Sequence, residues 1–230
     1  MLISGLQKTT LLDYPGHLAA TIFLGGCNFR CPFCHNRDLL EGNGAAAYSE
    51  EEILAFFSKR SRILEGVCIT GGEPTLQADL ADFIQKLRQF GLKIKLDTNG
   101  YQPRLLTALC QRGLIDYVAM DIKSGPSGYK TAAGWPDLDL TRIEQSISFL
   151  LKGSVPYEFR TTVVRGLHQA TDFEEIGPWI SGAERYFLQS YQDSEQVLCR
   201  GFSSFHKEEL LRFAAVVSPH VPSVSLRGVD

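Results

Sequence analysis

The apolar positions of this chain follow two different periods in turn. Short runs rich in β-branched and aromatic residues predict six strands, at residues 19–24, 66–70, 92–98, 117–122, 157–164 and 185–191. Segments with apolar residues at three- and four-residue spacing lie between them. The clearest, residues 76–91, is expected to form a helix that ends at Gly91. This alternation is typical of βα units around a parallel sheet.

Helix starts are marked by residue pairs that fit a capping box, in which side chains at both positions satisfy free amide groups. The pairs are Ser49 with Glu52, Thr141 with Glu144, and Thr171 with Glu174. Six βα units are fewer than the eight of a closed barrel. We therefore expect an α/β fold with an open, partial (β/α)6 barrel rather than a doubly wound sheet, and a single domain over residues 1–230.

Charge and hydropathy exclude two classes of partner. The formal net charge is −3 and the basic residues form no concentrated run, so we expect no binding to nucleic acid. The chain contains no run of about 18 apolar residues, and its first residues lack the basic and apolar parts of a leader. We therefore expect no membrane association and a cytoplasmic location.

Three of the six cysteines are clustered, at Cys27, Cys31 and Cys34 in the spacing C-x3-C-x2-C. Clustered thiols in a reducing compartment more often hold metal than form disulfides. Zinc could take the three cysteines and His35, although adjacent zinc ligands depart from the usual spacing. An iron–sulfur cube held by three thiolates would leave one iron open for a ligand.

Polar motifs follow four consecutive predicted strands. The cysteine segment follows the first strand, and "GGEP" at 71–74, "DTNG" at 97–100 and "DIK" at 121–123 follow the next three. In either α/β architecture, ligands gather at the carboxyl ends of the strands, so these motifs should face one mouth. The Gly- and Pro-containing stretch 124–137 should lie at the same mouth, either as a disordered segment or as a lid.

Several residues of these motifs suit a zwitterionic ligand. The carbonyls of Gly71 and Gly72 are open to an ammonium group, and Glu73 adds a carboxylate. The carboxylates of Asp97 and Asp121 should converge, which requires a polar ligand or a cation between them.

Two basic residues complete this set. Lys123 could pair with a ligand carboxylate, with a structural Asp–Lys ion pair as the alternative. Arg160 lies in an apolar strand and should meet a carboxylate or a ribose, because an unpaired buried charge is costly.

The order and spacing of these motifs resemble the radical S-adenosylmethionine (radical SAM) superfamily, whose signature C-x3-C-x-aromatic-C is matched by Cys27, Cys31, Phe33 and Cys34. "CHNRD", "LDTNGY" and "MDIK" are similar to activating enzymes of glycyl radical enzymes, among them pyruvate formate-lyase activase. "GLQKTTLLDYPG" at the start of the chain looks more like the activating proteins of anaerobic ribonucleoside-triphosphate reductase.

The resemblance implies one [4Fe-4S] cluster on the three cysteines, because the chain lacks the inserted cysteine-rich domain of some activases. S-adenosylmethionine (SAM) would chelate the open iron, and one electron would cleave it to methionine and a 5′-deoxyadenosyl radical. A monovalent cation near Asp97 and Asp121 is also implied. The cluster and SAM would carry the catalysis, with no further catalytic residue.

The residues expected to contact SAM come from the motifs and from this resemblance. Phe33 would lie beside the adenine, and Tyr191 or Gln192 stands where pyruvate formate-lyase activase has a histidine near the ribose. The full set is Phe33, His35, Asn36, Gly71, Gly72, Glu73, Asp97, Thr98, Asn99, Asp121, Lys123, Arg160 and Tyr191.

Three functions are compatible with these features. The resemblance favours an activase that takes a hydrogen from a glycine of a partner glycyl radical enzyme, with anaerobic ribonucleotide reductase as the expected partner and reduced flavodoxin or ferredoxin as the electron donor. A radical SAM enzyme acting on a small molecule in cofactor biosynthesis is the alternative. A redox or zinc-binding module that only docks a partner is the third, which the motif series disfavours.

Overall fold

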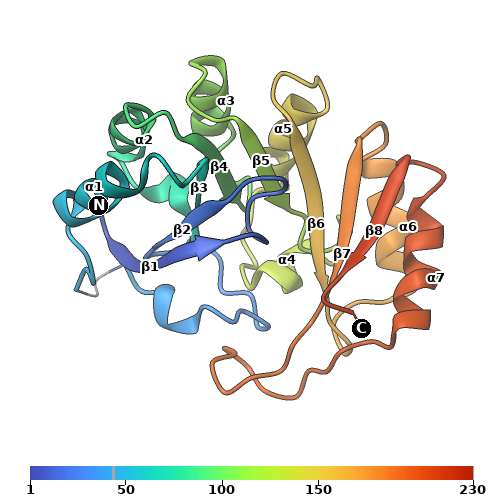
Figure 1. Cartoon of the computed structure of the whole chain (residues 1–230). Coiled ribbons are helices and arrows are strands. Elements are labelled where there is room, and N and C mark those ends of the chain that lie inside the picture. The colour runs from blue at the N-terminus through green and yellow to red at the C-terminus, as the bar shows by residue number, and fades with distance from the viewer. Residues whose placement is uncertain (43–44, 230) are drawn as a thin grey trace.

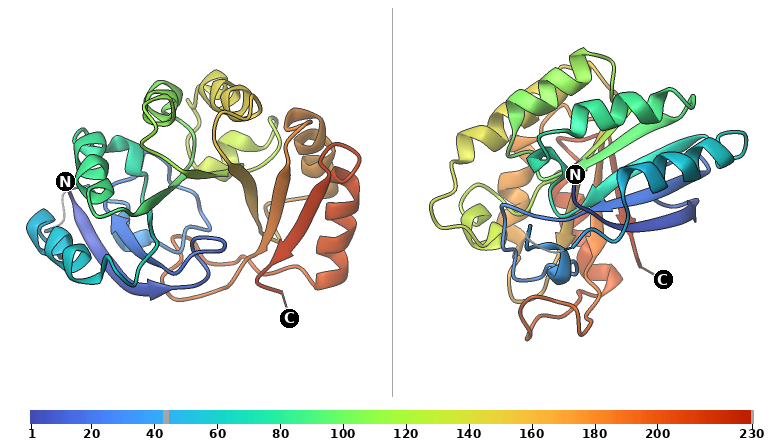
Figure 2. Two further views of the ribbon diagram at one scale, coloured as in Figure 1. Left: turned by 45° about the horizontal axis from the view of Figure 1, so that its top comes forward. Right: turned by 90° about the vertical axis from the view of Figure 1, so that its left-hand side faces the viewer.

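The strands form one curved sheet that stays open at its two edges (Figures 1 and 2). The computed structural model describes residues 1–42 and 45–229. The strands are β1 Ile3–Thr10, β2 Ala19–Leu24, β3 Gly66–Gly71, β4 Lys93–Thr98, β5 Tyr117–Asp121, β6 Tyr157–Val163, β7 Arg185–Ser190 and β8 Ser223–Arg227. Their spatial order follows the chain, so β1 and β8 are the edges.

The partial barrel is confirmed, but the described part of the chain forms eight strands where six were expected. Strands β2 to β8 are parallel, and β1 pairs antiparallel with β2. The six predicted strands are β2 to β7. The two that sequence analysis missed are the edges, where few residues are fully buried, so neither shows the continuous apolar run of a central parallel strand.

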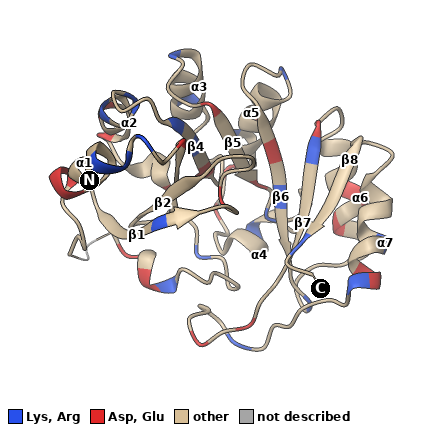
Figure 3. Ribbon diagram, in the orientation of Figure 1, with Lys and Arg blue, Asp and Glu red and all other residues tan. Residues whose placement is uncertain are grey.

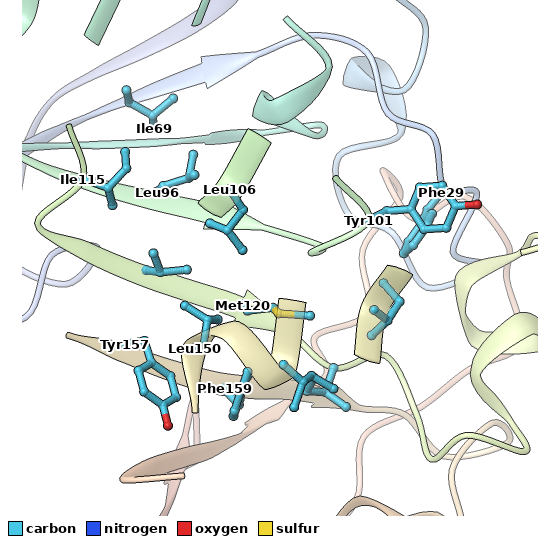
Figure 4. Close-up of a cluster of buried hydrophobic side chains, with 14 of the residues drawn as sticks. Phe29, Ile69, Leu96, Tyr101, Leu106, Ile115, Met120, Leu150, Tyr157 and Phe159 are labelled. Carbon is cyan, nitrogen blue, oxygen red and sulfur yellow. The ribbon is translucent and has the colours of Figure 1, made fainter. Parts of the chain in front are cut away.

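Helices cover the outer, convex face of the sheet, as Figure 2 shows. The helices of the described residues are α1 Glu50–Arg60, α2 Leu80–Arg88, α3 Pro103–Gln111, α4 Tyr129–Ala133, α5 Leu140–Leu150, α6 Ala170–Trp179 and α7 Lys207–Val217, with short 3-10 turns η1 Arg37–Leu39 and η2 Pro74–Leu76. Figure 4 shows how Leu96 of β4 and Met120 of β5 pack toward Leu106 of α3 and Leu150 of α5.

One of the three predicted capping boxes is confirmed, that of Ser49 and Glu52 at α1. The prediction at Thr141 and Glu144 is wrong, because Asp139 caps α5 by accepting a hydrogen bond from the Thr141 amide at 3.1 Å. The prediction at Thr171 and Glu174 is also wrong. Gln169 is the N-cap of α6, and its amide donates to the carboxylate of Asp172 at 2.7 Å. In α5 an earlier side chain reaches a free amide, and in α6 the Asp172 carboxylate reaches back to the Gln169 amide, so both helices begin sooner than expected.

The stretch 124–137 is a folded wall of the mouth and not a disordered segment. It contains α4, in which Tyr129, Ala132 and Ala133 are fully buried. The Ala133 carbonyl accepts a hydrogen bond from the Arg30 amide at 2.9 Å. A Cβ on Gly134, which has φ +63°, would lie 2.0 Å from the Arg30 carbonyl oxygen, so this contact requires glycine.

In residues 1–42 and 45–229, no helix has the length and apolar character needed to cross a membrane.

Candidate active site

A cavity of about 170 Å³ lies at the carboxyl ends of β3 to β6, and we call it the mouth cavity. It joins strand ends to the segment 25–40, which we call the cysteine loop (Figure 1). Its lining is Cys27, Phe29, Cys31, Phe33, Cys34, His35, Asn36, Leu40, Thr70, Gly71, Gly72, Asp97, Thr98, Asn99, Asp121, Lys123, Arg160 and Thr162. The motifs expected at one mouth are therefore brought together, whereas Glu73 and Tyr191 lie outside the lining.

The cysteine loop is held by backbone contacts at its base. The Gly26 amide donates to the Leu39 carbonyl at 2.7 Å, which closes the loop on itself. The Gly26 carbonyl accepts from the Glu73 amide at 2.8 Å. A Cβ on Gly72 would lie 2.1 Å from this carbonyl oxygen, so the second glycine of "GGEP" permits the close approach of β3 to the loop.

A second clamp comes from the segment after β7. The Cys199 amide donates to the Pro32 carbonyl at 2.8 Å, and the Leu198 amide donates to the Cys34 carbonyl at 3.1 Å. His35 contacts the Gln192 carbonyl through Nε2, and its ring lies 5.2 Å from that of Tyr191. Tyr191 therefore packs against the His35 ring at the edge of the mouth cavity.

Five charged side chains form a continuous chain of ion pairs across the floor of the mouth cavity, and we call them the ion layer. Arg160 lies at the centre, with Nη2 3.0 Å from Asp97 Oδ2 and Nε 2.5 Å from Asp121 Oδ1. Lys95 contacts the other oxygen of Asp97, and Lys123 Nζ lies 2.8 Å from Asp121 Oδ2. Figure 3 shows charged positions along β4, β5 and β6 at this level.

The charges of the ion layer stabilise one another. Burial alone would raise the pKa of Asp97 and Asp121, but the charges of Arg160 and of the lysine next to each hold both pKa values below the ordinary range. Burial would lower the pKa of Lys123, but Asp121 raises it above the ordinary range. With three cations and two anions, the layer has one positive charge to offer an anionic ligand.

This arrangement bears on three expectations. Arg160 meets carboxylates, as expected, and the Asp–Lys pair is present at Asp121 and Lys123. The repulsion from which a cation was inferred between Asp97 and Asp121 is already compensated by the chain's own side chains.

Glu73 is placed differently from the expected ammonium cradle. It is 1% exposed, and its Oε1 accepts from the Thr75 amide at 3.1 Å and from the Thr98 hydroxyl at 2.7 Å. Its Oε2 accepts from the Asn99 amide at 2.6 Å. Burial raises the pKa of Glu73, and these donors offset part of that effect. Glu73 therefore ties the end of β3 to the end of β4 beneath the cavity.

The remaining predicted residues lie at the cavity wall. Asn36 Nδ2 donates to the Gly71 carbonyl at 3.1 Å, which joins the cysteine loop to β3. Asn99 Nδ2 donates to Asn28 Oδ1 at 2.9 Å, which joins the loop to β4. Phe33 is 5% exposed between two of the cysteines.

Several residues of this region are not among those predicted from the sequence. Phe29, Leu40, Thr70 and Thr162 line the cavity, and Lys95 completes the ion layer. The alternation along β4 carried a signal for Lys95, because Lys95 and Asp97 are two residues apart and share a face. His168, which has no motif around it, donates to the Lys123 carbonyl at 2.8 Å.

Comparison with known proteins identifies the family. A sequence model of the Radical SAM superfamily matches residues 21–175. The chain therefore belongs to the radical SAM superfamily, a class of enzymes for which a [4Fe-4S] cluster and SAM are the implied cofactors.

Relatives differ in how much of the chain they cover. A protein of Methanocaldococcus jannaschii, provisionally named a glycyl-radical enzyme activating enzyme, is 29% identical over 100% of this chain and 97% of its own length. The pyruvate formate-lyase-activating enzyme of Clostridium pasteurianum is 31% identical over 57% of this chain and 57% of its own. A provisionally named GTP 3′,8-cyclase of Thermococcus kodakarensis is 30% identical over 65% of this chain and 48% of its own.

Among solved structures, Streptococcus suis SuiB bound to S-adenosylmethionine superposes with a TM-score of 0.68 at 13% identity, over 88% of this chain and 48% of that one. At this identity the likeness concerns the fold alone.

The residues of the mouth cavity fit the implied cluster. Three sulfurs line the cavity, yet among the described residues no three His, Cys, Asp or Glu side chains converge on the position of one metal ion. A cube takes one thiolate on each of three irons, so its ligands need no common centre. Burial raises the pKa of Cys27 to about 11 and of Cys31 to about 12, so bound iron must displace both protons.

Proposed function

We propose that this chain is an activating enzyme of a glycyl radical enzyme, with anaerobic ribonucleotide reductase as its partner. The observation that carries the proposal is a second cavity of about 370 Å³, which shares Asp97 and Arg160 with the mouth cavity and reaches the open side of the sheet. We call it the side cavity. A full-length relative that is provisionally named an activating enzyme supports the same function.

In this proposal Cys27, Cys31 and Cys34 hold a single [4Fe-4S] cluster, and residues 1–230 form one radical SAM core. The reduced cluster, when bound, supplies the electron that cleaves SAM to methionine and a 5′-deoxyadenosyl radical, which takes a hydrogen atom from the partner's glycine. A reduced flavodoxin or ferredoxin donates that electron. The reaction is placed in the cytoplasm, where free thiols such as these persist.

The chain's own residues would bind and orient SAM. The spare positive charge of the ion layer suits the methionine carboxylate, with Lys123, which lines the mouth cavity, as a donor. Phe33 offers a ring face to the adenine. The carboxylates of Asp97 and Asp121 would also hold the monovalent cation, in addition to their ion pairs with Arg160.

The open side of the sheet suits a polypeptide substrate. The turn after β1 reaches into this side (Figure 2), and its residues Leu12, Asp13 and Pro15 line the side cavity. Leu11 is 73% exposed and Leu12 is 90% exposed. Two adjacent exposed leucines beside a cavity are a docking feature for an apolar partner surface.

This turn is rigid. The Thr10 hydroxyl oxygen accepts from the Leu12 amide at 3.1 Å and from the Asp13 amide at 3.2 Å. The Thr21 hydroxyl donates to Asp13 Oδ2 at 2.6 Å. The leucines are therefore held outward before any partner binds, which lowers the entropic cost of docking.

A radical SAM reaction on a small molecule is the second candidate, because part of the chain is similar to the Thermococcus GTP 3′,8-cyclase. This similarity covers 48% of that protein, whereas the activating-enzyme relative is matched over 97% of its length.

The proposal is tested by electron paramagnetic resonance (EPR). The reduced, iron-loaded protein, mixed anaerobically with SAM and a co-encoded partner, should produce a glycyl radical doublet on the partner together with 5′-deoxyadenosine. A partner whose loop glycine is changed to alanine should give no doublet. Turnover of GTP or another small metabolite, with no radical on any protein, would favour the second candidate.

A further inference from the structure

His168 is a buried histidine at the junction of three parts of the mouth. It lies in the loop between β6 and α6 and is 3% exposed. Its Nδ1 accepts from the Val164 amide at 3.0 Å, which makes Nε2 the protonated nitrogen. Nε2 therefore donates to the Lys123 carbonyl, 2.8 Å away. Burial lowers the pKa of His168, which favours the same neutral form.

The ring of His168 also supports the cysteine loop. It packs edge to face against Phe33, with ring centroids 6.2 Å apart, and lies 6.4 Å from Phe173 of α6. One side chain thus contacts the main chain of Lys123, at the end of β5, and Phe33, between two of the cysteines. Both residues line the mouth cavity.

We propose that His168 is a positioning residue for the SAM site, which holds Lys123 and Phe33 at a fixed separation. The inference rests on the proposed use of these two residues in SAM binding. The hydrogen bond sets the backbone from which the Lys123 side chain reaches Asp121, and the ring contact sets the tilt of Phe33. Without His168 the two contacts for the ends of SAM would vary independently.

The test compares three variants of the iron-loaded protein. His168→Phe keeps a ring against Phe33 but removes both polar contacts, and His168→Gln keeps a donor for the Lys123 carbonyl. Thr161→Val is the matched control, because the Thr161 hydroxyl donates to the neighbouring Ile122 carbonyl at 2.7 Å and is equally buried. SAM dissociation constants, iron content and melting temperature are measured for each.

We expect His168→Phe to retain iron and to weaken SAM binding about tenfold, as for the loss of one buried hydrogen bond. His168→Gln should bind SAM within about threefold of the unchanged protein. Thr161→Val should lower the melting temperature while its SAM affinity stays unchanged. The shift that SAM causes in the EPR spectrum of the reduced cluster should be smaller in His168→Phe than in the control.

A double-mutant cycle identifies the route of the effect. If His168 acts through Lys123, then His168→Phe should weaken binding little further in a Lys123→Ala background. Equal SAM affinity in His168→Phe and the unchanged protein would overturn the inference. An equal loss of SAM affinity in His168→Phe and Thr161→Val would overturn it too. If His168→Phe loads no iron, His168→Gln decides, because it keeps a donor for the Lys123 carbonyl. A loss of SAM affinity in His168→Gln as large as that in Lys123→Ala would then overturn the inference. Failure of the unchanged protein to bind SAM at all would refute the proposed function itself.

Discussion

Glu73 gives the sharpest test of how the mouth is built, because its two proposed roles predict different results for Glu73→Gln. If Glu73 contacted the ammonium group of SAM, this change would weaken SAM binding and leave the apoprotein stable. In the structure, Glu73 accepts hydrogen bonds from the amides of Thr75 and Asn99 and from the hydroxyls of Thr75 and Thr98. The change should therefore destabilise the apoprotein.

The magnitude follows from the positions of the donors. A glutamine amide has one oxygen, and its NH2 group must face either the Thr75 amide on one side or the Asn99 amide on the other. In either orientation one buried N–H loses its acceptor, which costs about 1–3 kcal/mol. The other bonds lose their charge assistance, so we expect a total loss of about 2–4 kcal/mol in the free energy of unfolding.

The assay is urea denaturation of the apoprotein under reducing conditions. Glu144→Gln is the control, because Glu144 is exposed on α5 and its expected capping contact is not formed. This control should stay within about 0.5 kcal/mol of the unchanged protein. A Glu73→Gln protein as stable as the control would refute the role of Glu73 as a tie between β3 and β4.

Three further predictions concern the cluster, the docking turn and the ion layer. Changing any one of the three cysteines of the mouth cavity to alanine should abolish iron loading, whereas changing any of the other three cysteines should not, as iron analysis would show. Leu12→Asp should abolish radical formation on the partner but not partner-independent SAM cleavage, and Leu211→Asp on α7, where Leu211 is 52% exposed, should affect neither. Because the folded-state pKa values of Asp97 and Asp121 are depressed, their contribution to stability is fully present above the ordinary carboxyl pKa of about 4 and is lost as the pH falls further. Urea midpoints should therefore fall steeply below about pH 4, and midpoints that stay level there would contradict the assignment.

The sequence predicts the central strands and the mouth well, for a physical reason. Strands buried on both faces favour apolar runs, and β2, β3 and β5 show them. β4, β6 and β7 contain charged residues but are rich in the β-branched, aromatic and aliphatic residues typical of strands. Glycines and acids at the ends of such strands stand out in the sequence, so "GGEP", "DTNG" and "DIK" predict one shared mouth. The edge strands β1 and β8 were missed because their burial is partial and their pattern is mixed.

The direction of a side chain at a strand end is harder to predict. Glu73 turns beneath the cavity because two amides and two hydroxyls donate to it there, and two of these donors, the Thr98 hydroxyl and the Asn99 amide, come from the end of β4. His168 carries no motif, and its role depends on a carbonyl 45 residues away in the chain. Such long-range contacts exist only after the strands have been brought together.

The central claim is that the mouth generates a radical which takes a hydrogen atom from a glycine of a partner protein. The most direct measurement uses a partner labelled with deuterium on the α-carbon of its loop glycine. After anaerobic reaction with the reduced, iron-loaded protein and SAM, mass spectrometry of the 5′-deoxyadenosine should show one deuterium per molecule. Formation of 5′-deoxyadenosine without deuterium, under conditions in which the partner is bound, would contradict the account.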